Sequence, residues 1–119
     1  IMPIGHPANC PSIMAVAALD PKLQVADFSC TSDVNMGSQI DIAAPGVEIY
    51  SSYIKPENHE FLDGTSMATP FVSGIAALYL EQNPLLKPLE LWSLMAQNAK
   101  RLPLASVDIG SGLVQAPIY

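Results

Sequence analysis

Residues 65–82 constrain the fold more than any other part of the chain, because apolar side chains occur on every side of the helix that they predict. The apolar positions of this stretch are Met67, Ala68, Phe71, Val72, Ile75, Ala76, Ala77, Leu78 and Leu80. A helix that is apolar all round is a buried helix, whereas a surface helix keeps a polar face. The pair Asn83 and Pro84 ends this helix, and Pro88 begins a second one that is predicted over Leu89 to about Lys100. The chain therefore needs other structure around its central helix.

Extended segments are predicted before the central helix. Residues 12–20 form a near-continuous apolar run that ends at a turn signal, which suits a strand buried on both faces of a parallel sheet. Residues 24–29 alternate and predict a further extended piece, and residues 40–52 predict two strands joined at a Pro-Gly turn. Residues 53–60 are interpreted as a polar loop, and residues 108–117 as a tail that turns tightly at its glycines and returns as a short apolar run. Strands followed by a buried helix indicate an α/β fold.

The composition favours a chain whose apolar faces meet a partner. Half of the 119 residues are hydrophobic and 13% are charged, which leaves little polar surface for a body of this size. No apolar stretch approaches the roughly 20 residues that a membrane span needs, and no secretory signal is visible at the start. A net charge of -6 with five basic residues makes a nucleic-acid partner unfavourable.

The two cysteines leave two interpretations open. Cys10 and Cys30 cannot define a zinc site by themselves, and their spacing matches no metal-binding pattern. Either they form a disulfide in an exported protein, worth about 3 kcal/mol, or they are two buried thiols.

Ser66 is the main candidate for chemistry, within the stretch "FLDGTSMATPFVSGIAAL". A serine at a helix start can simply cap the helix. Gly64, however, permits close approach of a ligand, and the N–H groups of a first helical turn have no partners within the helix. An N–H there can stabilise an oxyanion that forms when the same residue's hydroxyl attacks a carbonyl. Because position 68 is alanine, this is not the G-x-S-x-G elbow of α/β-hydrolases.

The segment "GTSMATPFVSGIAAL" closely resembles the nucleophile segment of subtilisin-like serine proteases. Further segments resemble the same family in the family's order, namely "CPSIMAVAALD", "DFSCTS", "IDIAAPGVEIYSS" and "IGSGLVQA". The resemblance implies that residues 1–119 are the C-terminal portion of the catalytic domain, a parallel-sheet, three-layer α/β fold that is incomplete without its N-terminal portion. It implies a serine endopeptidase that cleaves polypeptides.

Carried over by position, the family motif assigns roles to five residues. Ser66 matches the nucleophile, and its backbone N–H is one oxyanion donor. Thr65 and Gly64 lie beside that hole, and Met67 is an oxidation-prone thioether. Gly5 matches the glycine at the floor of the primary specificity pocket, where it leaves room for large side chains.

The resemblance also implies a structural calcium ion. Asp41 matches an aspartate that helps to bind a cation in several members, together with carbonyl oxygens of Ala8, Cys10 and Ile13. Oxygen ligands of this kind suit calcium. Gln39 replaces an acidic residue often found nearby, and the alternative interpretation is that Asp41 only ends a turn or strand.

The base and its orienting carboxylate are not recognisable in this chain. His6 and His59 lack the sequence context of the family's histidine, and Asn9 lacks that of the oxyanion asparagine. Phe71 stands where many members have a structural histidine. The resemblance therefore implies a partner, the N-terminal portion that carries the catalytic aspartate and histidine, and also a propeptide or protein inhibitor as a further ligand. We expect an exported protein that is inactive as this chain alone. The alternative is a catalytically silent pseudoprotease or protein-binding module.

Overall fold

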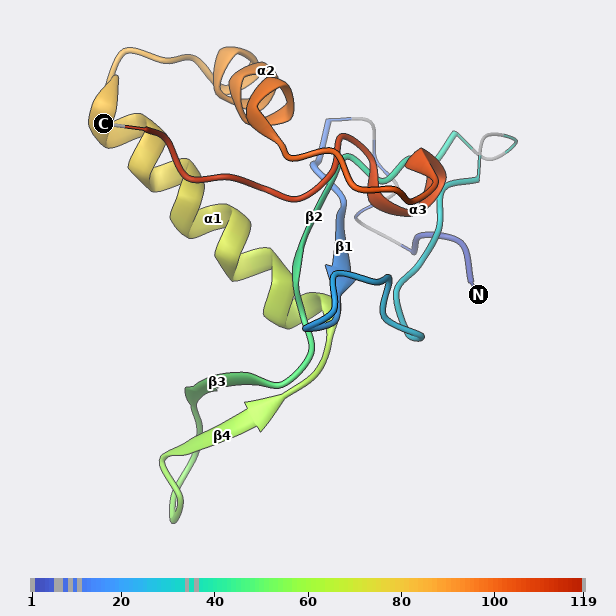
Figure 1. The fold of residues 1–119 in the computed structure, drawn as a ribbon. Helices are drawn as coiled ribbons and strands as arrows, with labels where there is room; N and C mark the ends of the chain where they lie inside the picture. Colours follow the sequence, from blue (N-terminus) through green and yellow to red (C-terminus); the bar gives the residue numbers. More distant parts are fainter. Residues whose placement is uncertain are drawn as a thin grey trace.

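The structure is a computed structural model, and it describes residues 2–5, 8, 10, 12–33, 35 and 37–118. In chain order its elements are β1 (Val16–Leu19), β2 (Ile42–Pro45), β3 (Ile49–Ser52), β4 (His59–Leu62), α1 (Thr65–Gln82), α2 (Pro88–Asn98) and α3 (Ser106–Ile109). Helix α1 crosses one side of the β1–β2 pair, while the β3–β4 hairpin projects away from the body (Figure 1). None of the helices described is long and apolar enough to cross a membrane.

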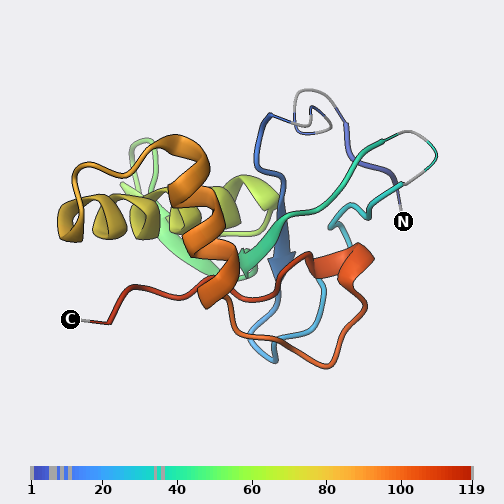
Figure 2. The ribbon, with the colours of Figure 1, turned by 90° about the horizontal axis from the view of Figure 1, so that it is seen from above.

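The core is built on the two parallel strands β1 and β2, whose register runs from Val16 opposite Ile42 to Leu19 opposite Pro45. Side chains alternate between the two faces of this sheet, as the period of a strand requires. One face, with Ala18, packs against α1 and α2, and the other, with Ala17, packs against α3 and the loops around it. Figure 2 shows α2 and α3 lying apart on either side of β1 and β2. The α/β class and its layered arrangement are confirmed.

Helix α1 has the bounds that the sequence predicts. It begins after Gly64 and ends at Asn83, whose N–H donates to the carbonyl oxygen of Tyr79. Pro70 is its sixth residue and therefore lies in the second turn, where it has no N–H to offer the carbonyl of Ser66.

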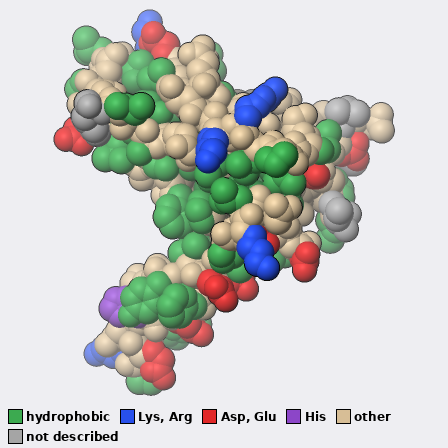
Figure 3. Space-filling view, viewed as in Figure 1, with side chains coloured by type: hydrophobic (Ala, Val, Ile, Leu, Met, Phe, Trp, Pro, Cys, Tyr) green, Lys and Arg blue, Asp and Glu red, His purple; other side chains and the backbone are tan. Residues whose placement is uncertain are grey.

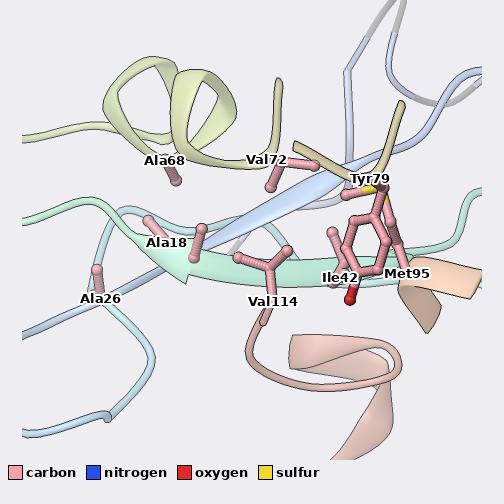
Figure 4. Close-up of a cluster of buried hydrophobic side chains, with 9 residues drawn as sticks. Ala18, Ala26, Ile42, Ala68, Val72, Tyr79, Met95 and Val114 are labelled. Carbon is pink, nitrogen blue, oxygen red and sulfur yellow. The ribbon is translucent and has the colours of Figure 1, made fainter. Parts of the chain in front are cut away.

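The burial of α1 differs from the prediction. Ala68, Val72 and Tyr79 are its buried residues, and they pack against β1, β2, α2 and the C-terminal segment (Figure 4). Phe71 and Leu78, in contrast, remain 41% and 37% exposed. The described chain covers only the side of α1 that faces the sheet, because it supplies no layer on the opposite side.

The polar loop that was predicted over residues 53–60 is confirmed for residues 53–58, and its last two residues belong to the β3–β4 hairpin. His59 and Glu60 belong to β4, which pairs antiparallel with β3 from Ser52 opposite His59 to Ile49 opposite Leu62. Only residues 53–58 form the connection. The prediction was wrong for these two residues because the short β4 is exposed and carries no apolar alternation that marks a strand.

The predicted strand over residues 12–20 is shorter in the structure, since the N–H of Ile13 donates to the carbonyl oxygen of Cys10 and makes a turn before β1. The extended piece over residues 24–29 is not formed. It turns instead, and only Val25 bridges to Leu19 at the edge of β1. Cys10 and Cys30 are free thiols, one exposed and one half-buried, so neither interpretation of the cysteines describes them.

The C-terminal segment returns to the sheet as predicted. Helix α2 ends at Asn98, earlier than expected, because Lys100 leaves the helix to exchange two backbone hydrogen bonds with Leu113. Gly110 and Gly112 have positive φ angles of 59° and 116° and turn the chain back after α3. Leu113 then forms a parallel bridge with Ala43, so the segment lies beside β2.

Tyr79 fastens the end of this segment to α1. Its hydroxyl donates to the carbonyl oxygen of Gln115 at 2.9 Å, and Gln82 donates to the carbonyl oxygen of Ile118 at 3.0 Å. Burial raises the pKa of Tyr79, and a hydrogen bond with Asn98 opposes that rise, so the hydroxyl keeps its proton at neutral pH.

Replacing Tyr79 by phenylalanine should therefore loosen the C-terminal segment. We expect Tyr79→Phe to lower the free energy of unfolding by about 1–2 kcal/mol, because the hydrogen bonds of the hydroxyl with Gln115 and Asn98 are lost while the ring is kept. Thermal or denaturant unfolding measures this change. Tyr53→Phe is the control, because Tyr53 is 46% exposed and its hydroxyl has no hydrogen bond with any described residue. An equal effect of both substitutions would contradict this role of Tyr79.

Candidate active site

Ser66 is the second residue of α1, and its side chain is exposed. Gly64, not Ser66, occupies the position that caps the helix, and no side chain caps it. The hydroxyl oxygen of Ser66 has no hydrogen-bond partner in the part of the chain that the structure describes. The capping interpretation of Ser66 is therefore excluded, and its hydroxyl is available to a ligand.

The backbone N–H groups of Thr65 and Ser66, beside the hydroxyl, are also available to a ligand. The N–H groups of Met67 and Ala68 both donate to the carbonyl oxygen of Gly64, at 3.0 and 3.3 Å. Those of Thr65 and Ser66 find no acceptor among the described residues. Unpaired N–H groups at the positive end of a helix favour negative charge. This end of α1 can therefore stabilise an oxyanion next to the Ser66 hydroxyl.

The backbone before α1 is held against the end of the sheet. The N–H of Gly64 donates to the carbonyl oxygen of Gly46 at 2.7 Å, and Gly64 has a φ of 154° that favours glycine. A Cβ on Gly46 would lie 2.6 Å from the Cβ of Ala18 and 2.8 Å from the carbonyl oxygen of Gly64. The sequence analysis missed Gly46, although its place in the Pro-Gly turn before β3 marked a tight turn.

Ser66 opens onto a cleft of about 660 Å³ between α1 and β3. The cleft follows α1 from Ser66 to Leu78, and Met67 and Phe71 form part of its wall. Most of the remaining lining is apolar, and the hairpin closes the other side with Tyr50. Figure 3 shows apolar side chains gathered on the hairpin and over the neighbouring body. A cleft of this character is open to a large apolar or polypeptide ligand.

The histidines do not complete the site within the described residues. His59 is exposed on β4, where its ring stacks on Tyr50 with the ring centroids 5.3 Å apart, and it does not line the cleft. His6 and Asn9 lie outside the described residues. The described chain thus brings no acid or base to the hydroxyl of Ser66.

The structure shows where Gly5 and Thr65 lie, and it does not test the roles predicted for them. Gly5 is exposed, and a Cβ there would meet nothing within 4 Å, so the space beside it is open. It does not line the cleft at Ser66. Thr65 is half-buried, and its carbonyl oxygen accepts a hydrogen bond from the hydroxyl of Thr69 at 2.9 Å.

Asp41 links the starts of the two parallel strands. Its Oδ2 accepts a hydrogen bond from the N–H of Ala15 at 2.7 Å. Burial raises the pKa of Asp41, and the hydrogen bond from Ala15 lowers it by less. No described lysine or arginine pairs with this carboxylate. Asp41 therefore has a structural role of the kind that the alternative interpretation expected.

The remaining predicted calcium ligands are only partly assembled. The carbonyl oxygen of Cys10 accepts the hydrogen bond from Ile13, and Ala8 is half-buried. Among the described residues there is no group of three or more His, Cys, Asp and Glu side chains that could hold a metal ion. The calcium site stays a prediction.

Comparison with known proteins agrees with this geometry. Residues 2–113 match the sequence model of the subtilase family. The chain is 39% identical over 113 residues to halolysin from Haloferax mediterranei, an alignment that covers 95% of the chain and 21% of halolysin. It is 41% identical over 115 residues to the subtilisin-like protease PopC from Myxococcus xanthus, covering 92% of the chain and 24% of PopC. For subtilisin DY from Bacillus licheniformis the identity is 38% over 112 residues, covering 93% of the chain and 38% of subtilisin DY.

A solved structure of a protease from Pseudoalteromonas arctica superposes with a TM-score of 0.80 and 27% identity, over 92% of the chain and 35% of that protease. The chain thus spans about a fifth to two fifths of the length of these relatives. The match covers nearly all of the described elements, from the segment before β1 to the return beside β2. The chain belongs to the subtilase family.

Proposed function

We propose that residues 1–119 are the C-terminal portion of the catalytic domain of a subtilisin-type serine endopeptidase, in which Ser66 is the nucleophile. The observation that carries this proposal is the exposed, unbonded hydroxyl of Ser66 beside two unpaired N–H groups at the start of α1. The names of its relatives, which include a subtilisin and a subtilisin-like protease, support the reaction class.

The chemistry follows from this placement. The Oγ of Ser66 attacks the carbonyl carbon of a peptide bond while a base takes its proton, and the carbonyl oxygen becomes an oxyanion. The Ser66 N–H stabilises that oxygen, with Thr65 and Gly64 beside it. The base then returns the proton to the leaving amine, and water hydrolyses the acyl-enzyme by the reverse sequence. Loss of a single oxyanion donor typically lowers kcat by about 10²–10³.

The N-terminal portion of the same protease supplies the histidine and aspartate in this proposal. A serine hydroxyl needs such a base, and none of the described side chains reaches it. The apolar cleft along α1 and the exposure of Phe71 fit a surface that this portion covers, since the chain spans only 21% of halolysin and 38% of subtilisin DY. Polypeptide substrates, and a propeptide or protein inhibitor, bind beside Ser66 in this proposal, and Gly5 belongs to the primary specificity pocket. We also propose that the protease is exported.

A fluorophosphonate probe tests Ser66 directly. In the protein with its N-terminal portion we expect the probe to label Ser66, and Ser66→Ala to abolish labelling, because the probe reacts with an activated serine. Ser73→Ala is the matched control, since Ser73 is an exposed serine of the same helix and should leave labelling intact. Labelling that persists in Ser66→Ala would exclude this nucleophile. A natural protein that folds but never reacts would favour the pseudoprotease.

Assembly of the two portions tests the partner. We expect residues 1–119 alone to show no peptidase activity and no cooperative thermal transition, and to gain both when the N-terminal portion is added. Phe71→Asp, in the cleft, should weaken this assembly by at least about tenfold, because a charge would be buried without a partner. Leu85→Asp is the control, because Leu85 is 88% exposed in the turn between the helices and lies outside the cleft. Peptidase activity of residues 1–119 alone would contradict the proposal.

We also propose that calcium binds at Asp41 with carbonyl oxygens of Ala8, Cys10 and Ile13. Support comes from the half-buried carboxylate, whose Oδ1 has no hydrogen bond and which no basic side chain neutralises among the described residues. The ion would stabilise the fold and take no part in the reaction.

Chelation tests this site. Calcium added after chelation should raise the thermal midpoint of the protein with its N-terminal portion, because a ligand that binds only the folded state stabilises it. Asp41→Asn should remove the response. Asp33→Asn should keep it, since the Asp33 carboxylate accepts a backbone hydrogen bond from Asn35 in a separate loop. An unchanged midpoint in the natural protein would count against calcium.

A further inference from the structure

We propose that Asp63 is a positioning residue for Ser66. Its carboxylate ties the end of β4 to the segment before β3 and thereby fixes the backbone from which α1 begins. This inference rests on the proposed role of Ser66 as nucleophile.

The hydrogen-bond ladder of the hairpin stops short of the helix. Its last paired residues are Ile49 and Leu62, and the next two positions along the strands are Glu48 and Asp63. Glu48 has a φ of 56°, a left-handed conformation in which a residue other than glycine is disfavoured. Its N–H does not pair with a backbone carbonyl and donates instead to Oδ1 of Asp63 at 2.7 Å. The side chain of Asp63 thus takes the place of a backbone acceptor and extends the pairing by one position.

The following residue is held just as closely. Gly64 donates its N–H to the carbonyl oxygen of Gly46 at 2.7 Å, and the N–H of Gly46 donates to the carbonyl oxygen of Leu19 at the end of β1 at 2.9 Å. Gly46 has no room for a side chain because Ala18 lies against it. One end of this connection is therefore fixed to the core sheet.

These contacts act on Ser66 because they are the hydrogen bonds among the described residues that fix the backbone just before α1, while the packing of Ala68 against the core holds the helix two residues after Ser66. The cap residue Gly64 has no side chain, and neither the N–H groups of Thr65 and Ser66 nor the Ser66 hydroxyl bonds to any described residue. The position of the hydroxyl thus depends on residues 63 and 64 on one side and on the packed Ala68 on the other. Asp63 is exposed, so its hydrogen bond adds little to overall stability, while it limits the freedom of the backbone three residues before Ser66. A displacement of about 1 Å at a reacting atom can cost about 10²-fold in rate.

Three variants of the protein with its N-terminal portion test this role. Asp63→Ala removes the acceptor, Asp63→Asn keeps an acceptor oxygen without the charge, and Glu57→Ala removes an exposed carboxylate of the same hairpin that bonds to no described residue. The readouts are kcat and KM for a peptide substrate, the rate of fluorophosphonate labelling, and the thermal midpoint. For Asp63→Ala we expect kcat and the labelling rate to fall about tenfold with little change in KM. Asp63→Asn and Glu57→Ala should stay within about threefold of the natural protein.

Several results would overturn the inference. The first is an Asp63→Ala variant that reacts at the natural rate. The second is an Asp63→Asn variant as slow as Asp63→Ala, which would assign the effect to charge. The third is a change in KM in place of kcat, which would assign Asp63 to substrate binding. If Asp63→Ala does not assemble, Asp63→Glu displaces the same acceptor by one methylene and should show the same fall in kcat. Ser66→Ala, measured in parallel, distinguishes failure of the proposed function from failure of the role proposed for Asp63. Persistent labelling in that variant removes the proposed function, whereas abolished labelling together with a normal Asp63→Ala removes only the role of Asp63.

Discussion

The structure depends on close packing of small residues around the two parallel strands. Ala17 and Ala18 in β1, and Ala43 and Ala44 in β2, are fully buried and point alternately to the two faces of the sheet. Such small side chains let a helix lie close to the strands, and Ala68 of α1 uses that proximity. The same close approach leaves no room for a side chain at Gly46, whose backbone carbonyl accepts the hydrogen bond from Gly64 just before α1. The start of α1 is therefore fixed by this backbone hydrogen bond together with the packing of Ala68.

The two sides of the candidate site differ in how firmly the core sheet holds them. The backbone before Ser66 is anchored to β1 through Gly46, whereas the far wall of the cleft belongs to a hairpin that projects from the body. On this hairpin the ring of Tyr50 stacks on that of His59 and lies tilted against that of Phe61, and all three side chains remain exposed. An anchored Ser66 beside an uncovered apolar wall fits the proposal that another part of the protein completes the site.

The sequence predicted those features that local patterns determine. The bounds of α1 follow from Gly64 and from the Asn83 and Pro84 pair, and the family motif around Ser66 identified the helix start. The sequence could not predict the interaction of Asp63 with Glu48, because it depends on two segments that meet only in the folded hairpin.

Errors arose where tertiary contacts override local preference. The alternating residues 24–29 turn away after a single bridge at Val25. The polar residues at the start of β4 pair because β3 is available beside them, and α2 stops early because Leu113 competes for the backbone of Lys100. The burial of α1 was predicted from the composition of the helix. That composition shows that the apolar sides of α1 need to be covered, and it does not show which part of the protein covers them.

The return of the C-terminal segment has a consequence for the order of events during synthesis. Ala43 of β2 bonds to backbone groups of Gly112 and Val114, so the free edge of β2 is closed by residues about seventy positions later in the chain. A ribosome releases β1, β2 and α1 well before those residues emerge. During that interval an unpaired strand edge is exposed beside apolar helix surface, a combination that favours aggregation and slow folding of sheets with distant contacts. Chaperone protection is thus most valuable over the stretch of translation between β2 and Val114.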